Sequence, residues 1–315
     1  MVRYIVNRLV QSFVLIVFVS LLTFFLIHSA PGGPAVLLAP DMSKEQIERA
    51  RKDLGLDDPI PVQYARWAGL VVRGNLGKSY SQGLPVTDLL ARRLPETLEL
   101  VFTGLALAVI AGVIIGIVSA RKQYSLTDKV LTGFSFFGMS VPVFWLGLML
   151  IIFFSVNLKL LPSSGSYTLG TPASILDRLA HLILPAVVLA TVNLAQIARY
   201  TRSSMLEVLN SDYLRTARAK GLKERVVMNR HALRNALIPI VTVVGLMIPR
   251  LVSGVAITES VFTWPGMGSL AVDSAVQRDY PVVMGITLMV SVLVVVTNFI
   301  TDVSYLILDP RVKLK

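Results

Sequence analysis

The sequence predicts an all-helical membrane protein with six transmembrane helices. Hydrophobic residues make up 54% of the 315 residues, and charged residues only 16%, below the quarter or so typical of soluble domains. The mean hydropathy is +0.68. Apolar runs of about 20 residues, long enough to cross a hydrocarbon core about 30 Å thick, recur along the chain. They occupy residues 9–30, 98–120, 130–157, 179–200, 236–258 and 282–308.

The first apolar run could be mistaken for a signal sequence, because Arg3 and Arg8 precede it. It is longer than the 7–15 apolar residues of a signal peptide, however, and the following "HSAPGGP" is a poor cleavage site. We therefore expect residues 1–30 to form a retained N-terminal transmembrane helix.

Residues 31–97 separate the first two runs and are expected to form a small helical insertion. Ser43 and Gln46 have the spacing of a capping box, and Gly55 would end the helix that they begin. Pro61 suits the first turn of a second helix. The apolar face of this second helix would consist of Tyr64, Trp67, Ala68 and Val71.

Basic residues in short loops are retained on the cytoplasmic side of a membrane, so their distribution tests the six-span arrangement. With both termini inside, the cytoplasmic segments hold 17 of the 30 basic residues but only six of the 19 acidic ones. The excess of charge thus lies where topology requires it, and no platform of interleaved aromatic residues accompanies it. This distribution excludes nucleic-acid binding as the reason for the net charge of +11.

The longest cytoplasmic segment, about 201–235, contains a glycine-centred basic element. Residues 212–219 favour a helix, Gly221 breaks it, and a second amphipathic helix follows. The apolar face of the second helix is formed by Val226, Val227, Ala232 and Leu233. A loop that only orients the protein needs a few lysines and no such element, so we interpret 212–234 as a docking surface.

The segment "RTARAKG" resembles the E-A-A-x-x-x-G loop of ABC transporter permeases, in the variant of the dipeptide and oligopeptide importers. Arg215, Thr216, Ala217 and Gly221 occupy the E, A, A and G places. Departures from the general motif are Arg215, Thr216 and "HALR" at 231–234, which place the chain in the peptide branch. Further matching segments, in order, include "GLDDPIPVQYARW", "GNLGKSY", "RLPETLEL" and "TESVFTWPGMGSLAVDSAVQRDYPVVMG".

The resemblance implies a permease of the type I ABC importer kind in the inner or plasma membrane of a prokaryote, importing peptides or a related solute. It implies a core over 98–315 and four kinds of partner: a second homologous permease, two cytoplasmic ATPases, an extracytoplasmic substrate-binding protein and membrane lipid. The cytoplasmic element would be a coupling helix that docks on an ATPase. Its coupling residues would be Arg215, Thr216, Ala217, Ala219, Lys220, Gly221, Leu222 and His231.

Two other functions fit the sequence less well. An intramembrane enzyme would need a metal cluster or a facing nucleophile and base, whereas the chain lacks cysteine and scatters its three histidines over different segments. "GNLGKSY" resembles the end of a phosphate-binding loop, but Val72 stands where its first glycine belongs, so we expect no ATP site, cofactor or metal. An ion-coupled secondary transporter would show similar halves, and these halves differ.

Polar residues within the apolar runs are the candidates for the translocation pathway. Asn193 and Gln196 share a helix face and would either line the conduit or join helices. Arg250 would face the conduit or extend to the outer interface, and Ser253 is grouped with it as a candidate. Small residues such as "AGVIIG" at 111–116 indicate close helix contacts.

Overall fold

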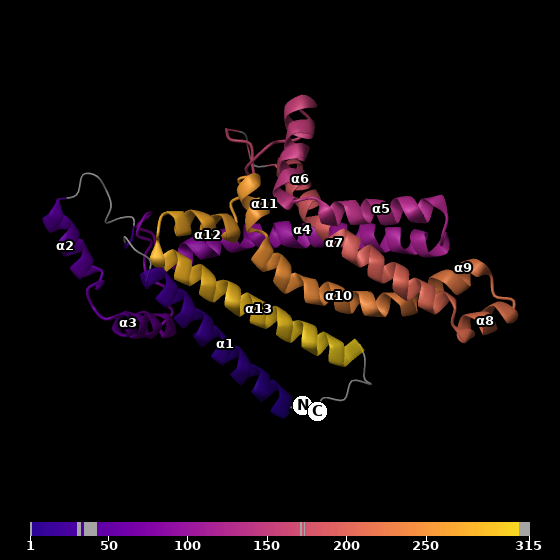
Figure 1. The fold of residues 1–315 in the computed structure, drawn as a ribbon, viewed down its shortest axis with the longest axis horizontal. Coiled ribbons are helices and arrows are strands. Elements are labelled where there is room, and N and C mark those ends of the chain that lie inside the picture. Colours follow the sequence, from indigo (N-terminus) through magenta and orange to yellow (C-terminus); the bar gives the residue numbers. More distant parts are fainter. Residues whose placement is uncertain (1, 30–32, 35–42, 171, 173, 309–315) are drawn as a thin grey trace. The chain divides into compact units, whose positions relative to one another are not determined.

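The computed structural model describes residues 2–29, 33, 34, 43–170, 172 and 174–308 (Figure 1). Within these residues the fold is helical, with one isolated antiparallel bridge between Lys78 and Pro85. The elements are α1 (Val2–Ser29), α2 (Lys44–Asp53), α3 (Ile60–Val72), α4 (Val86–Arg121), α5 (Leu126–Ser140), α6 (Val143–Leu150), η2 (Ile151–Asn157), α7 (Ile175–Leu209), α8 (Asp212–Ala219), α9 (Glu224–Val226), η3 (Val227–Ala232), α10 (Leu233–Gly254), α11 (Ala256–Val261), α12 (Met267–Val276) and α13 (Tyr280–Leu308).

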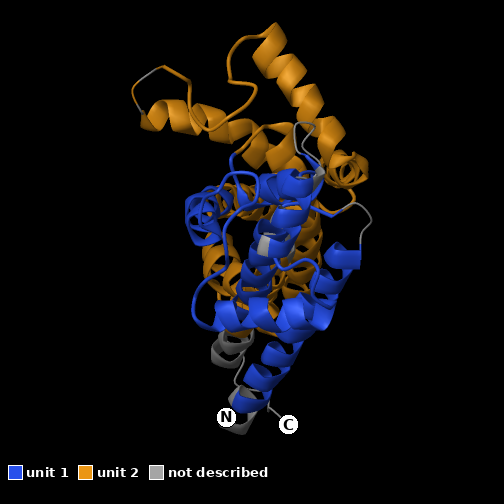
Figure 2. Ribbon diagram, turned by 90° about the vertical axis from the view of Figure 1, so that its left-hand side faces the viewer, with its two compact units in different colours: residues 1–97, 265–296, 314–315 blue, residues 98–264, 297–313 orange. Residues whose placement is uncertain are grey.

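The chain divides into two compact units (Figure 2). Unit 1 consists of residues 1–97, 265–296 and 314–315, and unit 2 of residues 98–264 and 297–313. Each unit is therefore built from segments that lie far apart in the sequence.

Five of the six predicted apolar runs form helices long and apolar enough to cross a membrane in the described residues. The third run, 130–157, differs from the predicted single span. It consists of α5 followed by α6 and η2, which meet at a bend of 105° (Figure 1). Pro142 disfavours a helical conformation of the residue before it, and Val141 is accordingly extended with ψ 128°. A proline inside an apolar run thus produces a broken span.

Both helices predicted within 31–97 are present in unit 1. The Ser43 backbone N–H donates to Gln46 Oε1 at 2.8 Å, and the Gln46 N–H donates to Ser43 Oγ at 3.3 Å, which confirms the capping box. Gly55, with φ +64°, follows the end of α2. The predicted face of α3 is half-buried, and the Tyr64 hydroxyl lies 2.9 Å from Ser20 Oγ of α1.

Asp279 links two segments of unit 1 that are distant in the sequence, 1–97 and 265–296. Its buried carboxylate, just before α13, accepts bonds from Ser79 Oγ at 2.6 Å and from Ser81 Oγ at 2.9 Å. The backbone N–H groups of Tyr80 and Ser81 donate to it at 3.1 and 3.0 Å. Burial, followed by the Asp279 charge, raises the pKa of Tyr80 to about 12. The segment "GNLGKSY" therefore donates hydrogen bonds to a carboxylate of its own chain.

In unit 2, α4 approaches α7 closely at glycine positions. A Cβ atom at Gly116 would lie 2.5 Å from Thr201 Cβ and 2.7 Å from the Ala198 carbonyl oxygen. A Cβ at Gly112 would lie 2.9 Å from Ile197 Cβ. The segment 111–116 thus makes the close helix contact that its small residues predicted.

Gly116→Ala should therefore destabilise the protein, because the added methyl group forces α4 and α7 apart. Overpacking of this kind costs about 1–3 kcal/mol. Gly133→Ala is the matched control, since a Cβ at Gly133 meets nothing within 4 Å. We expect a lower melting temperature in mild detergent for Gly116→Ala alone. Equal melting temperatures for the two variants would contradict the close contact.

Candidate functional site at the basic turn between α7 and α10

The predicted helix–glycine–helix element is present between α7 and α10. Helix α8 ends at Ala219, and α9 begins at Glu224 and continues through η3 into α10. Gly221 has φ +76°, a left-handed conformation that L-residues with side chains rarely adopt. A Cβ atom there would meet nothing within 4 Å. Backbone conformation, and not crowding, is therefore the reason for glycine at this position.

One face of α8 is buried within unit 2. Leu214 and Ala217 belong to a buried apolar cluster with Ala120 at the end of α4 and Met205 of α7. The cluster is completed by Val227, Ala232 and Ala236. Helix α8 therefore packs directly on η3 and shares a buried cluster with the ends of three long helices, α4, α7 and α10.

This packing changes two expectations. We predicted that Ala217 fits against a partner protein, but its side chain is buried in the chain's own cluster. Val226 was placed on the apolar face of the second helix, and it is 39% exposed because the face that packs on α8 consists of Val227 and Ala232. Which side chains of this element are buried is thus decided by the helices that it packs against.

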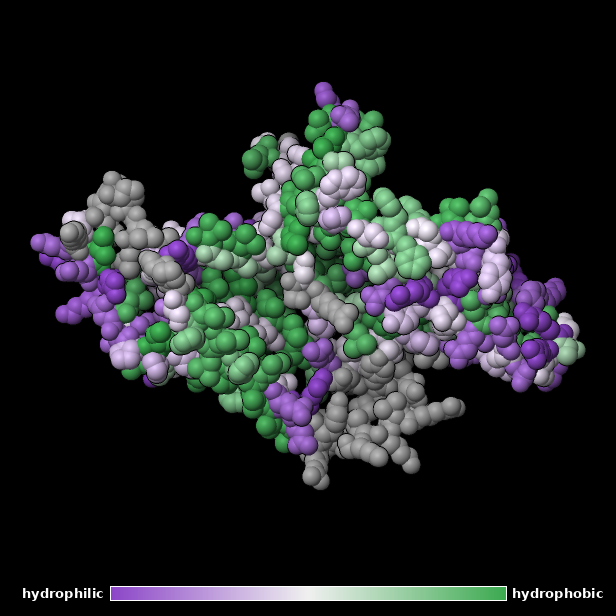
Figure 3. All heavy atoms as spheres, viewed as in Figure 1, coloured by the Kyte–Doolittle hydropathy of each residue, from purple (hydrophilic) through white to green (hydrophobic). Residues whose placement is uncertain are grey.

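The opposite face of the element forms a surface that we call the turn surface, and hydrophilic residues gather over α8 and α9 (Figure 3). Leu222 is 42% exposed at its apex. Of the other coupling candidates, His231 is half-buried. The turn surface consists of the exposed residues Tyr213, Arg215, Thr216, Ala219, Lys220, Gly221 and Leu222.

Two ion pairs stabilise the ends of the turn. Arg218 Nη2 lies 3.0 Å from Glu224 Oε1, so that the last turn of α8 is joined to the first residue of α9. Hydrogen bonding to Glu224 raises the pKa of Arg218. Arg215 pairs with Asp212 at 3.3 Å within α8. The turn surface therefore presents an ordered combination of cations and one exposed leucine, which suits protein docking and no bond chemistry.

A buried charge cluster, which sequence reasoning missed, lies beside the same helix ends in unit 2. The Asp128 carboxylate in the first turn of α5 accepts from Arg202 of α7, at 3.0 Å from Nε and 2.8 Å from Nη2. It also accepts a short hydrogen bond from Ser119 of α4 and one from the Tyr124 N–H at 3.0 Å. A single acid within a basic loop was the available signal, and we had counted it only toward topology.

The pathway candidates are not brought together at one site by their described contacts. Asn193 is half-buried and donates through Nδ2 to the Leu189 carbonyl of its own helix at 2.8 Å. Gln196 is also half-buried. Arg250 and Ser253 belong to α10, but their side chains lie outside what the structure describes. The described residues contain no group of three or more His, Cys, Asp or Glu able to hold a metal.

Similarity to known proteins covers nearly the whole chain. Residues 112–314 match the family described as "Binding-protein-dependent transport system inner membrane component", and residues 1–101 match its N-terminal counterpart. The chain is 47% identical over 315 residues to the oligopeptide transport system permease protein AppB of Bacillus subtilis, covering 99% of this chain and 100% of AppB. It is 38% identical to the dipeptide transport system permease protein DppB of Escherichia coli, over all of both chains.

Solved structures share the fold. A chain of the MetNI methionine ABC transporter in an inward facing conformation has a TM-score of 0.58 and 18% identity, covering 71% of this chain and 97% of that one. A chain of an amino acid ABC transporter has a TM-score of 0.51 and 16% identity, covering 69% of this chain and 93% of that one. With the matches to both family descriptions, the chain is a multi-pass membrane protein that belongs to the family of binding-protein-dependent transport system inner membrane components.

Proposed function

We propose that this chain is a permease subunit of an ATP-driven importer of dipeptides, oligopeptides or a related solute. The observation that carries the proposal is the turn surface, which is exposed while its helix α8 shares a buried cluster with the ends of α4, α7 and α10. Relatives named as oligopeptide and dipeptide permeases support the choice of peptides as cargo.

The packing of α8 provides a route by which movement of a bound ATPase is coupled to movement of the transmembrane helices. An ATPase bound to the turn surface displaces α8, and the buried contacts of Leu214 and Ala217 pass that displacement to the three helices beneath. Because a packed apolar cluster is nearly incompressible, the helices move with α8 instead of absorbing its motion. The chain itself carries out no bond chemistry, and ATP hydrolysis belongs to the partner ATPases.

The assembly has four further kinds of component in this proposal. A second homologous permease completes the conduit, two cytoplasmic ATPases occupy the turn surfaces, and an extracytoplasmic protein delivers the cargo. Residues 1–30 form the first span, 31–97 an extracytoplasmic insertion and 98–315 the permease core. Asn193, Gln196, Arg250 and Ser253 remain the candidates for the conduit.

The test of the proposed function combines purification and uptake. From cells producing the tagged chain, mild-detergent purification should yield an ATPase and a second permease in fixed proportion. Deletion of the chain should abolish uptake of labelled dipeptides or oligopeptides, and its return should restore uptake. Recovery of the chain without an ATPase, together with unchanged uptake after deletion, would contradict the proposal.

The proposed topology places the turn surface inside the cell and residues 31–97 outside. The chain has no cysteine, so Gln82→Cys and Lys122→Cys, both at exposed positions, each provide one reactive group. We expect an impermeant maleimide to label the cysteine at position 82 in intact cells and the one at position 122, on the same proposed side as the turn surface, only after lysis. The reverse pattern would overturn the assignment of both sides.

A further inference from the structure

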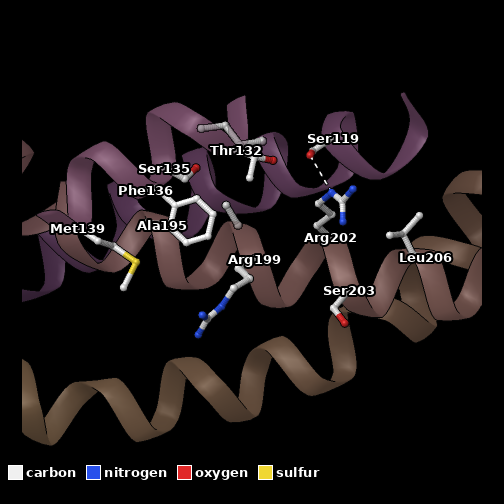
Figure 4. A pocket seen from close by; sticks show the side chains of 12 residues that line it. Ser119, Thr132, Ser135, Phe136, Met139, Ala195, Arg199, Arg202, Ser203 and Leu206 are labelled. Atoms are coloured by element: carbon white, nitrogen blue, oxygen red, sulfur yellow. Dashed lines mark hydrogen bonds between the residues drawn. The ribbon is translucent and has the colours of Figure 1, made fainter. Parts of the chain in front are cut away.

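A cavity of about 380 Å³ lies within unit 2 between α4, α5 and α7 (Figure 4). None of the predicted pathway residues lines it. Its volume is in the range of small-molecule sites, about 300–1,000 Å³. The cavity is therefore large enough for a small ligand, and the proposed function assigns none to it.

The lining of the cavity changes from apolar to polar along its length. Phe136 and Met139 lie at one end, and Ser119, Arg202 and Ser203 lie at the other (Figure 4). Ser119 is two residues from the end of α4 at Arg121, which corresponds to about 3 Å along the helix. In the proposed topology that end is cytoplasmic, so the polar end of the cavity lies at the depth of the inner-leaflet headgroups.

The charge available in the cavity comes from Arg199. The charge of Arg202 is neutralised by Asp128, to which it donates at 3.0 and 2.8 Å. The Arg199 guanidinium lies 5.7 Å from the Tyr200 ring, and within the described part of the chain it has no carboxylate partner. Ser203, one helical turn after Arg199, is exposed. The Arg199 side chain is directed away from Ser203 and toward the end of the cavity where Met139 lies (Figure 4), so Arg199 alone provides the charge that an anion would meet.

We propose that this cavity binds one anionic phospholipid of the inner leaflet. Its phosphate accepts hydrogen bonds from Arg199, because a guanidinium matches the acceptor oxygens of a phosphate. An acyl chain covers Phe136 and Met139 at the apolar end. Basic pockets between transmembrane helices on the cytoplasmic side are suited to such headgroups.

A transported peptide fits the cavity less well. A peptide carries an ammonium group as well as a carboxylate, and the carboxylate nearest the cavity, Asp128, is already bound by Arg202, Ser119 and the Tyr124 N–H. Among the described residues that line it, the cavity therefore offers one free cation and no free anion. This imbalance favours a ligand that is purely anionic at its polar end.

The test is lipid binding by the assembled transporter, measured by native mass spectrometry with added phosphatidylglycerol or phosphatidylcholine. We expect phosphatidylglycerol to be retained, and Arg199→Gln to weaken its binding about tenfold, the effect of losing one charge-assisted hydrogen bond. Lys122→Gln is the matched control, because it removes one positive charge just after the end of α4 without lining the cavity. Met139→Trp should weaken binding without any change of charge.

Three results would overturn the proposal: equal losses in Arg199→Gln and Lys122→Gln, equal retention of the two lipids, or displacement of bound lipid by a transported peptide. The last would assign the cavity to the conduit. If Arg199→Gln does not accumulate, Met139→Trp replaces it, and normal phosphatidylglycerol binding by this variant would be equally decisive. None of these outcomes bears on copurification of the ATPase, so the proposed function is tested separately.

Discussion

Asp128→Asn is expected to lower the stability of the protein by about 3 kcal/mol, with loss of folded material in detergent. The Asp128 side chain is 6% exposed and that of Arg202 28%. Removing one member of a buried pair leaves the other charge without compensation, at a cost of about 3–5 kcal/mol. We choose the lower value because Arg202 keeps some contact with solvent. The measurement is thermal unfolding followed by size-exclusion chromatography.

The chain provides a matched control for this result. Asp212→Asn removes an equivalent ion pair whose side chains are 71% and 95% exposed, and such pairs contribute about 0–1 kcal/mol. The double variant Asp128→Asn with Arg202→Gln should lose less than the sum of the single losses, because the stranded charge is gone. Equal losses of stability in Asp128→Asn and Asp212→Asn would show that the buried cluster stabilises the fold no more than an exposed ion pair does.

Leu222→Asp is expected to release the ATPases and abolish uptake while the protein remains inserted and folded. Leu222 is exposed at the apex of the turn surface and belongs to none of the buried clusters, so the change has little cost to the fold. It places a negative charge where a docked protein would bury an apolar side chain. Copurification of the ATPase and peptide uptake are measured together, at matched expression.

Gly221→Val tests the same surface through its backbone. Valine at φ +76° is strained by about 1–3 kcal/mol, so the turn adopts another conformation and the surface is lost. Leu126→Asp is the matched control for Leu222→Asp, since it adds the same charge at an exposed leucine at the start of α5. Ala217→Glu, by contrast, would disrupt the buried cluster of α8. Normal copurification for Leu222→Asp and Gly221→Val would remove the turn surface from the coupling pathway.

The features predicted correctly from the sequence are those with local signals. Apolar runs define spans by length alone, and the Ser43–Gln46 capping box and Gly221 act within a few residues of themselves. The bend at Val141 also has a local signal in Pro142, but hydropathy outweighed it in a continuous apolar run. At the turn, the helix boundaries were predictable because Gly221 marks them locally, whereas the π-helical stretch η3 was not predicted.

The features missed depend on residues distant in the sequence. Asp128 meets Arg202 across 74 positions, and no pattern in either segment identifies the partner. Ala217 was expected on a docking surface because the motif that it belongs to resembles an ATPase-docking loop. Only the positions of Ala120 and Met205, however, decide which face of α8 is buried. The helix–glycine–helix element was thus predicted at the right place in the chain, while the division of its residues between buried and exposed faces required the fold.

The hydrogen bonds to the Asp279 carboxylate determine how late in synthesis unit 1 can finish folding. Its partner Ser79 precedes it by 200 residues, so the loop 79–81 leaves the ribosome long before its acceptor exists. At about 5–20 residues per second, the wait is about 10–40 s. Over that interval the donors of this loop are satisfied by water, and α4 to α12 are made before unit 1 can close. Closure of the loop 79–81 onto Asp279 is therefore among the last events in the maturation of the chain.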